Sequence, residues 1–198
     1  PVVLKIQSPD ITHKTDVGGV VVGITTEEGV RQGFRQILAS VGEKAPTARI
    51  EGITVQRMVP TARGVEMILG AKKDPTFGAV LMVGAGGITT EVLRDMALGL
   101  PPLDEHLAMH LLESLKIWPL LRGFRGRPGM NLEKLLEVIM RFSYLVADFP
   151  EIREFDVNPL VVTPEEVVAV DARVVVDEEA LRNPPQPYSH LAIQPFCG

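Results

Sequence analysis

Residues 4–20, with the sequence L-K-I-Q-S-P-D-I-T-H-K-T-D-V-G-G-V, form the stretch on which the predicted fold depends. Apolar and polar residues alternate along its first part, which predicts a short strand with Leu4 on one face and Lys5 on the other. The turn signal Ser-Pro-Asp ends that strand, because proline fixes φ and aspartate can bond its own backbone. A polar loop and a pair of glycines then lead into a second predicted strand over residues 20–24.

The polar loop between these strands offers groups that suit a polyphosphate. It supplies hydroxyls, an imidazole and a lysine near Lys5, and paired glycines let a backbone approach a ligand closely. Oriented backbone N–H groups in such a loop can form an anion-binding nest. The alternative is an exposed hairpin in which Lys5 only protects an edge strand. The loop residues concerned are His13, Lys14, Thr15, Asp16, Gly18 and Gly19.

The composition argues against several classes of protein. The chain has 198 residues, of which 45% are apolar and 23% are charged, as in an ordinary globular protein with a core. A net charge of −5 without a basic block argues against nucleic-acid binding, and no apolar run reaches the roughly 20 residues of a membrane span. The single cysteine, Cys197, permits no intrachain disulfide, which favours a reducing, cytoplasmic compartment.

The middle of the chain predicts further helices and strands. A capping-box pattern starting at Thr25 predicts a helix that Gly42 ends. The apolar stripe of this helix would consist of Val30, Phe34, Ile37, Leu38 and Val41. Strands are expected over residues 53–59, 65–71 and 79–83. Two more helices are expected, one opened by Asp104 and one over residues 132–149.

Three patterns in this region match a known kind of site only in part. The glycines of residues 84–87 lack dinucleotide-binding spacing, because the third glycine of that motif would fall at Thr89. His106 and His110 lie one helical turn apart, but no third ligand accompanies them, so solvated or packed histidines are expected. The basic loop over residues 122–128 is expected to be solvated rather than an anion contact.

The last part of the chain predicts a hairpin that carries metal ligands. Residues 154–158 alternate strictly, which places Asp156 and Asn158 on the face opposite the core. If the turn at Pro164 is tight, Asn158 lies opposite Asp171 on the next strand. A carboxylate and an amide oxygen there would form half of a Mg²⁺ site that substrate phosphates and water complete. The alternative is a polar cross-strand pair on a solvated face.

Together these features resemble an ATP-grasp nucleotide-binding domain, an α+β fold of two antiparallel-sheet lobes with packed helices. More narrowly, the chain resembles the ATP-grasp portion of the NDP-forming acyl-CoA synthetases, relatives of the succinyl-CoA synthetase β subunit. The resemblance covers residues 2–177. It rests on the segments V-L-K-I-x-S-P-D-I-T-H-K-T-D-V-G-G-V, E-G-I-T-V-Q-R-M-V, E-M-I-L-G-x-x-x-D-P-x-F-G, F-D-V-N-P-L and V-D-A-R.

The resemblance implies a role for each matching position. ATP or ADP would be bound by Lys5, Lys14, Gly18, Gly19, Gln56, Met58, Val59 and Glu66. The segment from Gln56 to Val59 would be the hinge against which adenine lies. Mg²⁺ would be bound by Asn158, Asp171 and Asp156. His13 matches the histidine that, in ADP-forming acetyl-CoA synthetases, receives a phosphoryl group between nucleotide and acyl phosphate.

The resemblance also implies a domain organisation and partners. Residues 1–58 would form a small phosphate-loop lobe, incomplete at its start, residues 59–180 a large metal-binding lobe, and residues 181–198 a linker. With no initiator methionine, the chain is expected to be a piece of a longer protein whose CoA-binding lobes lie in cis or on another subunit. Residues 187–195 resemble the junction to a GNAT domain in bacterial protein lysine acetyltransferases. The expected function is therefore an acetate–CoA ligase, or alternatively an inactive regulatory domain of such an acetyltransferase.

Overall fold

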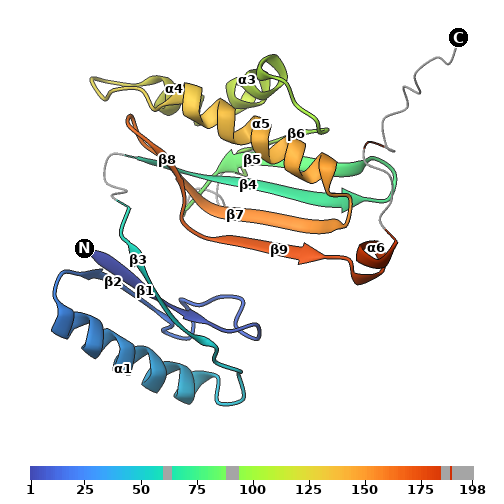
Figure 1. Ribbon diagram of the computed structural model, residues 1–198. Helices are drawn as coiled ribbons and strands as arrows, with labels where there is room; N and C mark the ends of the chain where they lie inside the picture. The colour runs from blue at the N-terminus through green and yellow to red at the C-terminus, as the bar shows by residue number, and fades with distance from the viewer. Residues whose placement is uncertain (60–63, 88–93, 184–187, 189–198) are drawn as a thin grey trace, which may run out of the picture. The chain divides into compact units, whose positions relative to one another are not determined.

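The computed structural model divides into two compact units, Pro1–Val59 and Pro60–Gly198, and each is described by itself below. The boundary expected from the sequence lies one residue earlier. None of the helices in the described part of the chain has the length and apolar character needed to cross a membrane. The structure describes residues 1–59, 64–87, 94–183 and 188 (Figure 1).

The smaller unit is a three-stranded antiparallel sheet with one helix along it (Figure 1). Its elements are β1 (Val2–Gln7), β2 (Val20–Ile24), α1 (Glu27–Lys44) and β3 (Gly52–Arg57). Leu4 and Ile6 are fully buried and pack with Ile37 of the helix, as the alternating pattern predicts. β1 is the central strand, between β2 and β3. The alternative in which Lys5 protects an edge strand is therefore wrong, and its side chain is only 7% exposed.

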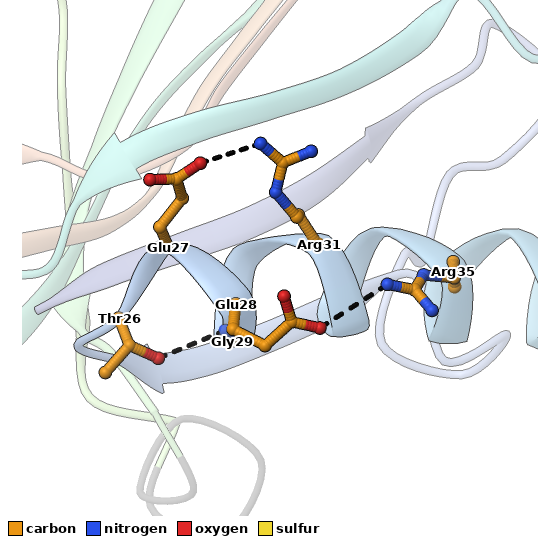
Figure 2. A network of polar contacts seen from close by, with 6 residues as sticks. All are labelled: Thr26, Glu27, Glu28, Gly29, Arg31 and Arg35. Carbon is orange, nitrogen blue, oxygen red and sulfur yellow. Dashed lines mark hydrogen bonds and ion pairs between the residues drawn. The ribbon is translucent and has the colours of Figure 1, made fainter.

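The helix α1 begins one residue later than the sequence predicts. Thr26, rather than Thr25, is the N-cap, because its Oγ1 accepts a hydrogen bond from the N–H of Gly29 at 3.1 Å (Figure 2). Two exposed ion pairs follow in the next turns, Glu27–Arg31 at 2.7 Å and Glu28–Arg35 at 3.5 Å. The two acidic residues complement the positive end of the helix dipole, so this end is stabilised by local contacts.

The buried stripe of α1 also differs from the prediction. Gly42 lies inside the helix, which continues to Lys44. The residues facing the sheet are Gly33, Ile37 and Val41, whereas Phe34 and Leu38 are 45% and 37% exposed. The reason is that the helix approaches the sheet closely at Gly33. A Cβ on Gly33 would lie 3.1 Å from Ile24 Cδ1 and 3.8 Å from Leu4 Cδ1. The helix therefore meets the sheet along the glycine side, and the larger side chains turn away.

The larger unit is built on a six-stranded antiparallel sheet in the order β6-β5-β4-β7-β8, with β9 also paired to β7. The strands are β4 (Val65–Asp74), β5 (Gly78–Ala85), β6 (Met96–Gly99), β7 (Ile152–Val162), β8 (Val167–Ala169) and β9 (Ala172–Val176). The helices within the described residues are α3 (Glu105–Ser114), α4 (Trp118–Arg122), α5 (Leu132–Asp148) and α6 (Glu178–Arg182). Asp104 caps α3 as predicted, since its Oδ1 accepts from the N–H of Leu107 at 2.8 Å.

One face of this sheet is covered by α3, α4 and α5, and Figure 1 shows α5 running across it. The rings of Phe142 on α5 and Phe155 on β7 lie 4.8 Å apart between centroids. The core beneath the helices includes Met67, Leu69, Leu81, Leu112, Leu135 and Ile139. Because side chains alternate along a strand, the intervening residues lie on the opposite face. We call this the second face, and Gly70, Met82, Asp156 and Arg173 lie on it. Asn158 follows Asp156 on β7 by two residues, and its N–H bonds Asp171 O.

The strand expected over residues 167–174 is interrupted, which gives the short β8 and the separate β9. The interruption lies opposite Pro159, whose O accepts the N–H of Val170 at 3.0 Å. Proline has no N–H to return that bond, so the ladder loses a contact at this point. The pairing itself is kept on both sides of the break, because Leu160 lies opposite Ala169 and Val157 opposite Ala172.

Candidate functional site

The loop between β1 and β2 closes on itself through its two glycines. The N–H of Gly19 donates to Lys14 O at 2.7 Å, and the N–H of Gly18 donates to Thr15 O at 3.0 Å. With Gly18 in the left-handed region at φ 68°, these bonds form a Schellman-type closure of a single helical turn. The two glycine amides are therefore used inside the loop. The role of Gly18 and Gly19 in nucleotide binding stays a prediction.

Packing against β1 and α1 fixes the same loop. A Cβ on Gly18 would lie 2.3 Å from Ser40 Oγ, and one on Gly19 would lie 2.5 Å from Ile6 Cγ2. Ser40 Oγ donates to Val17 O at 3.0 Å, so the helix holds the loop from one side. His13 is exposed on this loop. The imidazole is thus presented to solvent from a backbone that the helix and the strand hold in place.

Replacing Gly19 by alanine should destabilise the smaller unit. The added methyl group would overlap Ile6 Cγ2 at 2.5 Å and Lys14 O at 2.8 Å, and overpacking of this kind costs about 1–3 kcal/mol. Urea unfolding followed by circular dichroism measures the loss. The matched control is Gly42→Ala in α1, where nothing lies within 4 Å of the new methyl group, and this change should not destabilise. Equal stability of Gly19→Ala and the unchanged chain would contradict the prediction.

The other candidates of the smaller unit lie on β1, on β3 and in the segment that follows it. Lys5 is buried between Val20 and Thr54 of the neighbouring strands, and Thr54 Oγ1 donates to Lys5 O at 3.4 Å. Gln56 is exposed on β3. Met58 and Val59 come next and are half-buried, and the N–H of Met58 donates to Pro1 O at 3.1 Å.

The remaining candidate residues belong to the larger unit. Glu66, a nucleotide-binding candidate, lies on β4, whereas the candidate metal ligands lie on the hairpin of β7 and β9. Glu66 lies near the start of β4, where the N–H of Gly86 donates to Glu66 O at 2.7 Å. A Cβ on Gly87 would lie 2.9 Å from Glu66 Oε2, so the carboxylate borders this glycine turn. Residues 88–93, which include Thr89, lie outside the described residues. Asp156, Asn158 and Asp171 lie together on the hairpin formed by β7 and β9.

The hairpin has the register that the sequence predicts. Thr163 N–H donates to Glu166 O at 2.9 Å across the turn, which shows that the turn is tight. The N–H of Asn158 donates to Asp171 O at 3.1 Å, so these two residues lie opposite each other. Asp156 is paired with Arg173 two positions further along. The predicted juxtaposition of Asn158 and Asp171 is therefore confirmed, while their role in metal binding stays a prediction.

The charges on this face influence one another. The pKa of the Asp156 carboxyl is raised above its ordinary value, mainly because surrounding atoms remove part of its hydration. The positive charge of Arg173, which is paired with Asp156 across the strands, lowers that pKa, and the negative charge of Asp171 raises it. Asp156 is exposed as a whole residue, but its Oδ1 leans over β4 to within 3.7 Å of where a Cβ on Gly70 would lie.

Sequence reasoning missed Arg173 and Gly70 as parts of this site. Arg173 could have been found from the alternation of β9, because it lies two residues beyond Asp171 and therefore on the same face. Gly70 had no comparable signal. Its place beside Asp156 depends on the pairing of β4 with β7, which are far apart in the sequence.

The oxygen atoms on this face fit Mg²⁺ as a partial ligand set. Two carboxylates and one amide are hard oxygen donors, and Mg²⁺ normally keeps several waters and adds phosphate oxygens. Among the described residues there is no cluster of three or more His, Cys, Asp or Glu side chains that could hold a metal alone. His106 and His110 are both exposed on α3, which is the solvated one of the two arrangements expected, solvated or packed. The hairpin therefore suits a metal that arrives with its nucleotide.

The family match and two similar proteins cover nearly the same share of this chain. Residues 1–176 match a family described as the ATP-grasp domain. The chain is 38% identical over 176 residues to the β subunit of acetate–CoA ligase (ADP-forming) I from Pyrococcus furiosus, covering 89% of this chain and 75% of that protein. It is 40% identical over 179 residues to acetate–CoA ligase (ADP-forming) I from Archaeoglobus fulgidus, covering 90% and 26%. The chain thus spans most of a separate β subunit but only part of a single-chain ligase.

Solved structures of a synthetase from Ca. Korarchaeum cryptofilum have the same fold. Its dinucleotide-forming acetyl-coenzyme A synthetase 1, in complex with coenzyme A, Ca-AMPCP and HgCl⁺, superposes with a TM-score of 0.85 at 41% identity. That match covers 89% of this chain and 76% of the other. A second structure of that synthetase holds coenzyme A and Mg-AMPPCP, with its phosphohistidine segment pointing towards the nucleotide site. It superposes with a TM-score of 0.77 at 37% identity, covering 89% and 76%.

Proposed function

Because the chain belongs to the ATP-grasp domain family, in the group of the ADP-forming acetate–CoA ligase β subunits, we propose that it binds ATP or ADP with Mg²⁺ and transfers a phosphoryl group. The observation that carries this proposal is the 38% identity over 176 residues to such a β subunit. The matched residues include the His13 loop and the Asn158–Asp171 pair. The complete enzyme would be an acid–thiol ligase that joins acetate or a related acid to CoA.

In the proposed step, His13 carries the phosphoryl group between the nucleotide and an acyl phosphate. The bond from the γ-phosphorus to the ADP oxygen breaks, a bond from phosphorus to an imidazole nitrogen forms, and the ring loses its proton to solvent. Such transfers depend on positioning and on neutralising phosphate charge. Lys5 would neutralise charge from the smaller unit, and Asp156, Asn158 and Asp171 would hold Mg²⁺. When bound, Mg²⁺ would neutralise phosphate charge as well.

The CoA-binding and ligase parts of such an enzyme would lie in cis or on another subunit. The relatives reported above include both arrangements, a separate β subunit and a single-chain ligase. The alternative function, a regulatory domain of an acetyltransferase, rests on the resemblance of residues 187–195 to a GNAT junction. Apart from Tyr188, whose hydroxyl hydrogen-bonds the carboxylate of Asp148, this segment lies outside the described residues. The relatives reported above are acetate–CoA ligases, which favours the ligase function over the regulatory one.

Isothermal titration tests the binding part of the proposal. ATP and ADP, each with and without Mg²⁺, are titrated into the chain, and both should bind, more tightly when Mg²⁺ is present. This result is expected because phosphates complete the ligand set that the hairpin begins. Absence of nucleotide binding by a chain with normal circular dichroism would overturn the proposal.

Phosphorylation of His13 tests the chemical part. The complete full-length protein, incubated with γ-labelled ATP, should acquire label that acid removes and base does not, and His13→Ala should abolish it. His110→Ala is the matched control, because His110 is also an exposed histidine and should leave the label in place. Label that persists in His13→Ala would contradict the assignment of the acceptor. Absence of label in every variant, with nucleotide binding intact, would support the regulatory alternative.

A further inference from the structure

Gly70 occupies a position in which the fold does not require a glycine. It lies in the middle of β4, paired with Met82 on one side and Asp156 on the other. It is not among the glycines with positive φ. A Cβ placed on it would lie 3.5 Å from Met82 Cε and 3.7 Å from Asp156 Oδ1, which are ordinary van der Waals distances. An alanine would therefore fit without displacing its neighbours.

Gly84 in β5 and Gly86 just after it differ in this respect. A Cβ on Gly84 would lie 2.8 Å from Asp95 O, and one on Gly86 would lie 2.8 Å from the carbonyl carbon of Glu66. At those positions backbone atoms exclude any side chain. At Gly70 they do not, and a glycine inside a strand weakens the strand because it loses more backbone freedom on folding than alanine does. The missing side chain at Gly70 is thus not explained by a backbone clash, although Gly70 itself is buried beneath Met82 and Asp156.

The space that this side chain would fill adjoins the candidate metal ligands. Asp156 Oδ1 lies 3.7 Å from where a Cβ on Gly70 would be, and Asn158, whose N–H bonds Asp171 O, follows Asp156 on β7 by two residues. A Mg²⁺ ion held there would keep a shell of water and phosphate oxygens around it. Those oxygens need room next to the carboxylate, and a methyl group on residue 70 would take part of that room. On the other side, Met82 is a flexible side chain that can shift when a ligand enters.

We infer that Gly70 is a positioning residue of the metal–nucleotide site, leaving beside Asp156 the room that a Mg²⁺-bound water or phosphate oxygen occupies. Glycines are typical of strand positions that a ligand approaches closely. The inference rests on the proposed function, because it presupposes that Mg-nucleotide binds on the second face. It goes beyond that function because it assigns a role to Gly70, namely that residue 70 must lack a side chain for Mg-nucleotide to bind.

The test is the substitution Gly70→Ala, compared with Gly42→Ala in α1. Gly42→Ala is the same chemical change at an exposed site with nothing within 4 Å. Gly70→Ala should raise the melting temperature of the larger unit by about 1–4 °C, because alanine restricts the unfolded chain. In isothermal titration it should weaken ATP binding with Mg²⁺ by roughly 10–100-fold, as outer contacts of metal sites do. ATP binding without Mg²⁺ should stay unchanged, and Gly42→Ala should change neither affinity.

The outcomes separate this inference from the proposed function. If the unchanged chain binds Mg-ATP and Gly70→Ala binds it equally well, the inference is wrong and the proposed function stands. A lower melting temperature for Gly70→Ala would also overturn the inference, because packing would then require the glycine. If the unchanged chain shows no Mg²⁺-dependent ATP binding, the proposed function fails and the inference fails with it. Higher stability combined with a selective loss of Mg-ATP affinity supports both.

Discussion

Replacing Lys5 by methionine should weaken ATP binding by about 10–150-fold, because a charge-assisted contact contributes about 1.5–3 kcal/mol. Lys5 lies on the central strand β1, next to the loop that carries His13, and on the face opposite the core residues Leu4 and Ile6. Its side chain is only 7% exposed, so an apolar side chain of similar length should be accommodated. Isothermal titration measures the affinity, and circular dichroism and thermal unfolding should show an intact fold.

The matched control for this prediction is Lys134→Met. Lys134 lies on α5, where its Nζ pairs with Glu137 Oε2 at 2.9 Å on the exposed side of the helix. The same loss of one positive charge there should leave ATP affinity unchanged, because an exposed pair of this kind contributes little. If Lys5→Met binds ATP as well as the unchanged chain, and both fold normally, Lys5 would have a role in packing alone.

Most of the secondary structure follows from local patterns. The helix over residues 132–149 was expected from its apolar spacing, and α5 spans Leu132–Asp148 with Leu135, Leu136 and Ile139 buried. Spacing along one helix depends on 3.6 residues per turn and on nothing distant, which is why it can be read from the sequence. The hairpin register could be predicted for a similar reason, because a tight turn fixes which residues oppose each other.

The sequence-based predictions fail where a contact between residues far apart in the sequence determines the local structure. The stripe of α1 was misjudged because Gly33 allows the helix to approach Ile24 closely, and a pattern of apolar residues does not reveal that a glycine faces the sheet. The closure of the loop through the amides of Gly18 and Gly19 was not predicted, because paired glycines suit both a phosphate nest and a Schellman closure. Sequence alone does not distinguish the two, since the difference lies in which carbonyl each N–H reaches.

The candidate site was only partly predictable for the same reason. Asn158 and Asp171 lie on neighbouring strands joined by a short turn, so local reasoning places them opposite each other. Gly70 approaches Asp156 through the pairing of β4 with β7, and these strands are separated in the sequence by β5, β6, α3, α4 and α5 among the described elements. Long-range strand pairing has no local signal, so residues that join a site through it are found only in the structure.

Replacing Asp171 by asparagine should remove most of the Mg²⁺-dependent part of ATP binding. Asparagine keeps the shape of the side chain and an oxygen that can accept the N–H of Ala172, now bonded to Asp171 Oδ1 at 3.1 Å, so the hairpin should fold normally. Metal-free ATP binding should change little, or improve slightly, because one negative charge near the phosphates is removed. The loss of Mg-ATP affinity should be at least about 100-fold, larger than for contacts outside the metal shell.

Thermal shift measurements show this loss directly. At an ATP concentration of about 100 times Kd, binding stabilises the unchanged chain by roughly 2.7 kcal/mol, which corresponds to about 5–11 °C for a chain of this size. In Asp171→Asn the additional shift caused by Mg²⁺ should disappear, while the shift caused by ATP alone remains. Glu165→Gln, which removes a carboxylate from the turn of the same hairpin, is the matched control and should keep the full shift.

The alternative for Asp171 gives the opposite pattern. If Asn158 and Asp171 form only a polar pair on a solvated face, Asp171→Asn would leave the Mg²⁺-dependent shift unchanged, because that shift would then depend on other ligands. The register does not distinguish these cases, since the N–H of Asn158 bonds the backbone oxygen of Asp171 in both. The side-chain charge does distinguish them. A selective loss of the Mg²⁺-dependent shift, with metal-free ATP binding retained, therefore assigns the carboxylate of Asp171 to the metal.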